Sequence, residues 1–203
     1  MAAKKKTWFA ILGLLSWKPL SGYDIKKLVE IGLSHFWSES YGQLYPTLDQ
    51  LVAEGLARKK PAQSGKRKRF IFTITAKGRR EFQNWLSQPT EPPQLRSEFQ
   101  LKFFLSSRRP LAECLRLLQE YREQQQELYE LYTTSDAILS QALDEDTLPE
   151  EMRGVLDDGS REQVLIFLLT LRHGVRSCEA RLAWCDEAAQ MLQDEVRRRA
   201  SVA

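Results

Sequence analysis

The sequence predicts a mainly α-helical protein of two domains, and three observations carry this prediction. Segments with apolar residues at helical spacing fill most of the chain. One proline-rich break, QPTEPP at 88–93, interrupts them. The charge changes sign there, because residues 1–88 hold 16 Lys/Arg against 6 Asp/Glu and residues 89–203 hold 14 against 21. We therefore expect a basic domain over 1–88, a linker over 89–94 and an acidic, all-helical domain over 95–203.

Before the break, the pattern predicts three helices, a hairpin and a fourth helix. The first helix should cover about 7–16 and stop ahead of Pro19, because the residue before a proline disfavours the α conformation. The second should begin after Ser21, whose side chain is a favourable N-cap. Thr75 offers the same kind of cap to the fourth helix, which should continue through Leu86.

The third predicted helix, 41–54, has an apolar stripe on one side and ends at Gly55. With the stripe facing inward, polar and small side chains lie on or beside the outer face, where glutamine or threonine can read base edges in DNA. Pro46 removes a backbone hydrogen bond from this helix, so we expect a tight or kinked first turn. An amphipathic helix with a solvated outer face explains the pattern equally well. The candidate DNA-reading residues are Tyr41, Gly42, Gln43, Tyr45, Pro46 and Thr47.

Two short strands are predicted over 56–60 and 69–74, joined by the loop 61–68. Four adjacent cations lie at the tip of this hairpin: Lys66, Arg67, Lys68 and Arg69. Because neighbouring cations repel one another, a hairpin that presents them gains most when phosphates lie alongside. A solvated turn that blocks aggregation is the alternative, but the neighbouring candidate reading helix favours DNA. Three helices followed by a two-stranded wing is the order of a winged helix-turn-helix.

After the break, only helices are predicted. An apolar run at 101–105 precedes a long polar helix over about 111–132, and an acidic stretch follows. The last segment repeats apolar residues at alternating spacings of four and three, which is typical of a coiled-coil-like dimerisation helix. Phe167 and Trp184 widen its apolar face, so this helix should also pack on its own domain. The predicted dimerisation residues are Val164, Leu168, Leu171, Val175, Cys178, Leu182, Cys185, Ala189 and Leu192.

The remaining composition argues against several other classes of protein. Three cysteines without a Cys-x-x-Cys pattern predict reduced thiols, as in cytoplasmic proteins, and the isolated His35 and His173 offer no metal site. No catalytic or cofactor-binding motif is present, so we expect neither an enzyme nor a bound cofactor. No segment approaches the roughly 20 apolar residues of a membrane span, and the basic and apolar start of the chain lacks a signal-peptide cleavage site.

Several strings occur in the order found in one known family. They are ILGLL at 11–15, PLSGYDI at 19–25, FW at 36–37, SYGQLYPTL at 40–48, EGL at 54–56 and ITAKGR at 74–79. Over about residues 8–86 the chain therefore resembles the PadR family of bacterial transcription regulators. EFQLKFFL at 98–105, LTLRHG at 169–174 and the later Trp184 resemble the long C-terminal domain of the virulence-regulator-like branch of that family.

This resemblance implies a homodimer whose C-terminal helices swap or pack around the partner. It also implies two winged helices on double-stranded DNA at an inverted-repeat operator, usually with repression, and a small-molecule effector in some members. Trp37, Trp85 and Trp184 are candidates for lining an effector pocket, although core packing also explains each of them. A winged helix that contacts another protein, with no role in DNA binding, is the alternative function.

Overall fold

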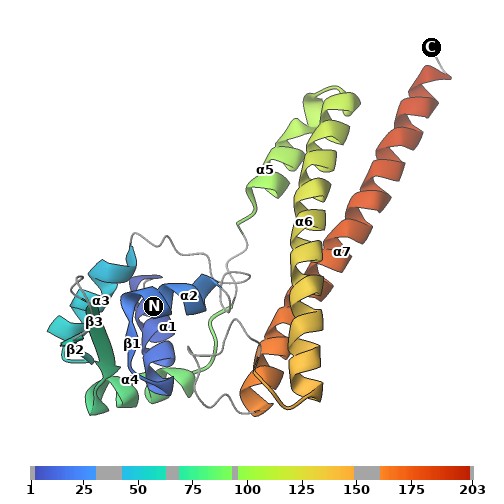
Figure 1. Ribbon diagram of the computed structural model, residues 1–203. Helices are drawn as coiled ribbons and strands as arrows, with labels where there is room; N and C mark the ends of the chain where they lie inside the picture. Colours follow the sequence, from blue (N-terminus) through green and yellow to red (C-terminus); the bar gives the residue numbers. More distant parts are fainter. Residues whose placement is uncertain (1–2, 31–42, 63–68, 93–95, 149–160, 202–203) are drawn as a thin grey trace. The chain divides into compact units, whose positions relative to one another are not determined.

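The computed structural model describes residues 3–30, 43–62, 69–92, 96–148 and 161–201 (Figure 1). These residues fall into two compact units that divide between Glu91 and Pro92, inside the segment predicted as the linker. The first unit contains helices α1 to α4 and a small sheet, and the second contains helices α5 to α7. Among the residues described, no helix combines the length and the apolar character needed to cross a membrane.

The first unit is a helical cluster with a three-stranded antiparallel sheet of order β1-β3-β2. The predicted hairpin is confirmed, since β2 and β3 pair along their whole length. The sequence did not predict β1, which consists of only two residues and therefore shows no strand periodicity. It forms because β3 offers a free edge, where Leu20 pairs with Phe72 and Ser21 with Ile71. The elements are α1 Ala3–Trp17, β1 Leu20–Ser21, α2 Gly22–Leu28, α3 Leu44–Ala53, β2 Ala57–Ala62, β3 Arg69–Ile74 and α4 Ala76–Leu86.

Residues from α1, α2, α3 and the sheet form the core of this unit, and α4 adds the half-buried Phe82 and Trp85. The predicted leucine stripe of the third helix is confirmed, because Leu44, Leu48 and Leu51 are buried. Trp85 of α4 stacks on Phe9 of α1 with ring centroids 4.9 Å apart, so its role is to hold α4 on α1. The other large, fully buried side chains of the unit are Leu12, Leu15, Leu20 and Ile25.

The three predicted helix-end signals are confirmed. Ser21 and Asp24 form a reciprocal capping box at the start of α2, and the Thr75 side chain accepts from the Gly78 N–H at the start of α4. Gly55 ends α3 with a φ of 68°, and the Leu56 N–H donates to the Leu51 carbonyl at 2.8 Å, as in a Schellman motif.

Pro46 is the third residue of α3, because the helix begins at Leu44. The first turn of a helix has no intrahelical acceptors for its N–H groups, so proline loses no hydrogen bond here. The expected distortion of the turn is therefore not required. Tyr41 and Gly42, which the sequence placed at the start of this helix, lie outside the described residues.

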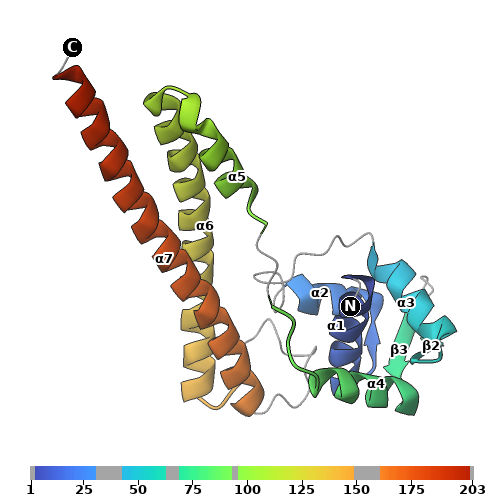
Figure 2. The ribbon, with the colours of Figure 1, turned by 180° about the vertical axis from the view of Figure 1, so that it is seen from behind.

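The second unit contains α5 Glu98–Leu105, a 3-10 turn at Ser106–Arg108, α6 Leu111–Asp144 and α7 Arg161–Ala200. Figures 1 and 2 show α6 and α7 side by side and antiparallel, with the C-terminal end of α7 diverging from α6. Two ion pairs confirm this direction: Arg172 contacts Asp136 at 2.7 Å and Arg122 contacts Asp186 at 2.6 Å. Helix α6 is longer than the predicted 111–132.

The predicted dimerisation seam of α7 lies mostly within the chain. Its residues Val164, Leu168, Leu171, Val175, Cys178 and Cys185 are already buried in a single chain, whereas Leu182, Ala189 and Leu192 are half-buried. The structure therefore accounts for the burial of these residues within one chain, and their assignment to an interface between chains stays a prediction. A heptad pattern requires an apolar neighbour without specifying which chain supplies it.

Helix α6 supplies that neighbour. At Gly174, an added Cβ would lie 3.2 Å from the ring of Tyr132, so the glycine allows the two helices to approach closely. Trp184 meets Phe99 and Phe103 edge-on at 5.9 Å, and Phe99 stacks on Tyr121 at 3.8 Å. This aromatic cluster holds α5 against α6 and α7, so Trp184 packs on its neighbours with one side and stays 38% exposed. Trp37 lies outside the described residues.

Candidate nucleic-acid interface

Helix α3 exposes a polar side opposite its leucine stripe. Gln43, Tyr45, Pro46 and Asp49 are exposed, as expected for a face that reads DNA. Thr47 is only 5% exposed, so its predicted position beside the outer face is wrong. It lies three residues after Leu44 and four before Leu51, a spacing that puts it on the buried side.

Tyr45 links the exposed face of α3 to the start of α2. A Cβ added to Gly22 would lie 2.6 Å from the Tyr45 ring, so a larger residue at this position would displace the ring. The ring nevertheless stays 58% exposed. The contact therefore fixes how α2 and α3 approach each other and leaves the tyrosine available to a partner.

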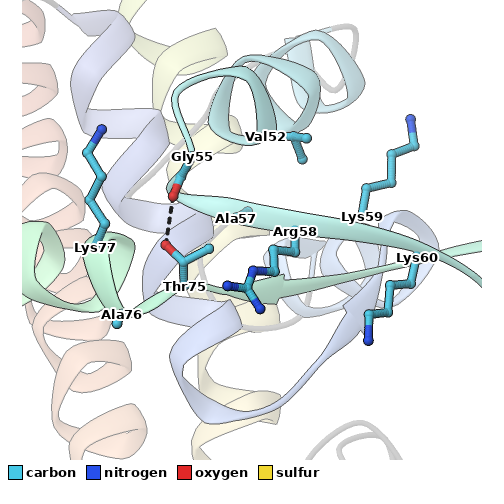
Figure 3. A pocket seen from close by; sticks show the side chains of 9 residues that line it. All are labelled: Val52, Gly55, Ala57, Arg58, Lys59, Lys60, Thr75, Ala76 and Lys77. Atoms are coloured by element: carbon cyan, nitrogen blue, oxygen red, sulfur yellow. Dashed lines mark hydrogen bonds between the residues drawn. The ribbon is translucent and has the colours of Figure 1, made fainter.

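The cations of the hairpin differ in their surroundings. Lys59 of β2 forms an ion pair with Asp49 of α3 at 2.9 Å, and its ammonium lies 4.6 Å from the centre of the Phe70 ring. Arg58 and Lys60 are exposed, and neither has a carboxylate partner in the described part of the chain. Figure 3 shows the side chains of Lys59 and Lys60 leaving β2 on opposite sides, as strand alternation requires.

Arg69, the first residue of β3, has an acidic partner within the chain. Its guanidinium lies 2.8 Å from Asp24 and 2.9 Å from the Ser21 hydroxyl. Burial by itself raises the pKa of Asp24, but hydrogen bonds from Ser21 and the charge of Arg69 outweigh it and lower that pKa below its ordinary value. The sequence could not indicate this pair, because its members are 45 residues apart. Lys66, Arg67 and Lys68 lie outside the described residues.

An open hollow of about 640 Å³ lies between the end of α3, β2 and the start of α4 (Figure 3). The Thr75 hydroxyl donates to the Gly55 carbonyl at 2.7 Å, and the Lys77 ammonium donates to the Glu54 carbonyl at 2.8 Å. These bonds join the two helix ends that border the hollow. Among the residues that the structure describes, its lining contains cationic side chains and no carboxylate, cysteine or histidine side chain. The lining residues are Val52, Gly55, Ala57, Arg58, Lys59, Lys60, Thr75, Ala76 and Lys77.

These features define a class of protein. A helical cluster, a polar exposed face on its third helix and a cationic hairpin beside that face form a winged-helix DNA-binding domain. Residues 11–84 match the transcriptional regulator PadR-like family, and residues 95–193 match the virulence activator alpha C-terminal family. The chain therefore carries a PadR-like family domain followed by a virulence activator alpha C-terminal domain, and the predicted class, a DNA-binding regulator, is confirmed.

Three relatives agree with this assignment. The negative transcriptional regulator PadR of Bacillus subtilis is 38% identical over 102 residues, which are 49% of this chain and 56% of that protein. A probable transcriptional regulator of Mycobacterium tuberculosis is 27% identical over 92% of this chain and 97% of its own. The solved structure of the Vibrio cholerae virulence activator AphA superposes with a TM-score of 0.71, at 26% identity, over 93% of this chain and 98% of that one. The chain thus spans just over half of the Bacillus relative and nearly all of the other two.

Proposed function

We propose that the protein is a homodimeric repressor that binds an inverted-repeat operator in double-stranded DNA. The observation that carries this proposal is the polar outer face of α3 beside a cationic hairpin, in a chain that carries a PadR-like family domain. Gln43 and Tyr45 would read or contact the DNA from α3. Phosphates would be bound by Arg58 and Lys60 together with the cations that the sequence places in the loop, namely Lys66, Arg67 and Lys68.

The second unit supports the dimer through the apolar side chains that it leaves exposed. Soluble monomers rarely expose large groups of apolar residues, and such groups mark protein interfaces. Because the buried part of the α7 seam is already used within the chain, the exposed apolar residues are the ones available to a second copy. They are Leu101, Phe104 and Leu105 on α5, Leu131 and Ile138 on α6, and Leu165, Ile166, Leu169, Met191 and Val196 on α7.

Repression follows from the position of such a dimer on the operator. A protein bound across an operator excludes the transcription machinery from the same DNA, and the Bacillus relative is named a negative regulator. The AphA relative is named an activator, so a reporter assay decides the direction of regulation. The proposal places the protein in the cytoplasm with the chromosome, and it includes no catalytic step. A small-molecule effector remains a prediction from the family resemblance.

The proposal is tested by capturing genomic DNA fragments with the full-length protein and sequencing them. We expect a shared inverted repeat, bound by two chains with an affinity that falls steeply as salt rises. The two recognition helices should lie about 34 Å apart, one turn of DNA. Sedimentation should give a dimer at micromolar concentration. A monomer at that concentration contradicts the dimer, and fragments bound without enrichment or salt dependence favour the protein-contact function instead.

A further inference from the structure

Three polar groups meet where the sheet joins α2: the Ser21 hydroxyl, the Asp24 carboxylate and the Arg69 guanidinium. We refer to these three residues as the Ser21 node. The Ser21 hydroxyl and N–H donate to Asp24 Oδ2 at 2.6 and 3.0 Å. Arg69 Nη2 donates to both carboxylate oxygens, at 2.8 and 3.0 Å, and to Ser21 Oγ at 2.9 Å. The start of wing strand β3 is thereby attached to the start of α2.

Ser21 has three structural roles at this point. It is a residue of β1 and pairs with Ile71 of β3, it caps α2, and it accepts a hydrogen bond from Arg69. It is also only 2% exposed, so its polar groups are compensated by these partners and not by bulk water. A change in the position of β3 is therefore transmitted directly to the first turn of α2.

The node also adjoins the reading helix. Gly22 follows Ser21, and the ring of Tyr45 rests against Gly22 so closely that a Cβ there would lie 2.6 Å from it. The backbone that the node holds is thus the surface on which an exposed residue of α3 packs. The wing strand β3 is thus connected to α2 through the Ser21 node, and α2 is connected to α3 through the contact between Gly22 and Tyr45.

The surroundings of Arg69 are those of an internal ion pair. A phosphate approaching it would also approach Asp24, whose negative charge opposes binding and whose two oxygens both accept from Nη2. Arg58 on the adjacent β2 differs, because it is exposed and has no carboxylate partner in the described part of the chain. The two arginines of the hairpin therefore have different roles, although the sequence groups Arg69 with the cations before it.

We propose that Arg69 is a positioning residue, which holds the wing in register with the reading helix through Asp24 and Ser21 and makes no phosphate contact of its own. This inference rests on the proposed DNA-binding function and assigns a different role to a residue that the sequence predicted to be a wing anchor. All three acceptors are held by Nη2 alone. Arginine suits the task because its planar guanidinium fixes the direction of the two N–H groups of that atom, whereas the ammonium of lysine is a freely rotating point charge.

The test uses the full-length protein, a duplex selected by it from a random library and a scrambled duplex of equal composition. Affinities of wild type, Arg69→Lys, Arg69→Ala, Asp24→Asn and the Asp24→Asn/Arg69→Lys double variant are measured at several salt concentrations. Arg80→Lys is the matched control, since it makes the same change at an exposed arginine of α4 that has no acidic partner in the described part of the chain and that the proposal does not place on DNA. Circular dichroism and urea titration of each variant establish that the folded protein is being compared.

Arg69→Lys and Asp24→Asn should each lower affinity for the selected duplex by about fivefold, the upper range for an exposed ion pair, and reduce the preference over scrambled DNA. The salt slope should stay that of wild type, and the double variant should be no weaker than either single variant. Arg80→Lys should retain wild-type behaviour.

Two results would overturn the inference while leaving the proposed function intact. One is full activity of Arg69→Lys together with a salt slope that Arg69→Ala flattens by about one unit, the signature of a phosphate contact. The other is an Asp24→Asn variant with unchanged affinity and preference. A wild-type chain that binds no duplex removes the proposed function and this inference with it.

Discussion

Helices α3 and α7 each bury one side within the chain, but they leave different surfaces exposed. Helix α3 buries its leucine stripe and exposes Gln43, Pro46 and Asp49. Helix α7 buries most of its seam against α6 and still exposes large apolar residues such as Ile166 and Leu169. The surface that remains after intrachain packing indicates the partner: polar groups beside cations suit DNA, and apolar groups suit a second protein chain.

Leu168 and Leu169 separate the two sides of α7 most sharply, since Leu168 is 2% exposed and Leu169 is 52% exposed. Leu168→Ala should lower the free energy of unfolding by about 2–5 kcal/mol, because it leaves a cavity between α6 and α7. Leu169→Ala, the matched control, should change the stability of the isolated chain much less. Urea denaturation of both variants at low protein concentration measures the difference. Equal losses would mean that the two sides of α7 are not distinct.

The exposed apolar side of α7 is tested by Ile166→Glu. Burying a charge in place of an isoleucine at an interface loses at least the transfer energy of the side chain, about 1.5–3 kcal/mol. We therefore expect the dimer dissociation constant to rise by tenfold or more, with helix content unchanged. Sedimentation over a concentration series measures the shift. Glu187→Gln, on an exposed position of the same helix, serves as the control, and an unaltered dimer in Ile166→Glu would place the interface elsewhere.

A substitution on the exposed side of α3 should change how strongly the protein prefers its operator to scrambled DNA. Gln43→Ala should cost about 1–3 kcal/mol at particular operator positions and little on scrambled DNA, because a base contact is lost. Arg67→Ala in the loop should instead weaken all sequences alike and flatten the salt slope by about one unit. Binding titrations on both duplexes at several salt concentrations distinguish these outcomes. The opposite pattern would exchange the roles of α3 and the wing.

The smallest expected effect concerns the pH dependence of stability at Asp24. Its pKa is lower in the folded chain than the ordinary value of 3.8, so the ionised group stabilises the fold above that pH. This contribution should disappear as the pH falls through the lowered pKa and the carboxylate takes up a proton. The difference between wild type and Asp24→Asn, below about 1 kcal/mol for a partly exposed pair, should therefore shrink in acid. Urea titrations at pH 7 and pH 3 provide the comparison, and a difference that grows in acid would contradict the lowered pKa.

Much of the fold and part of the candidate interface could be predicted from residues close together in the chain. Ser21, Gly55 and Thr75 form their helix-end bonds within a few residues, so their roles depend on local geometry alone. The leucine stripe of α3 follows in the same way from helical spacing, and it places Gln43 on the exposed side. The wing strands were predictable because the two short segments and the loop between them are also local.

Other features depended on which distant segments meet in space. Periodicity along a helix determines which side is buried, but it carries no information on the neighbour that covers that side. For this reason the seam of α7 suggested a second chain, whereas the tertiary structure covers most of it with α6. The same reason explains Arg69, which the sequence groups with the loop cations and the fold pairs with Asp24, 45 residues away. Local sequence determined the helix ends and the buried faces of this protein. Only the tertiary structure decided which helix covers the α7 seam and which carboxylate pairs with Arg69, because these partners come from distant parts of the chain.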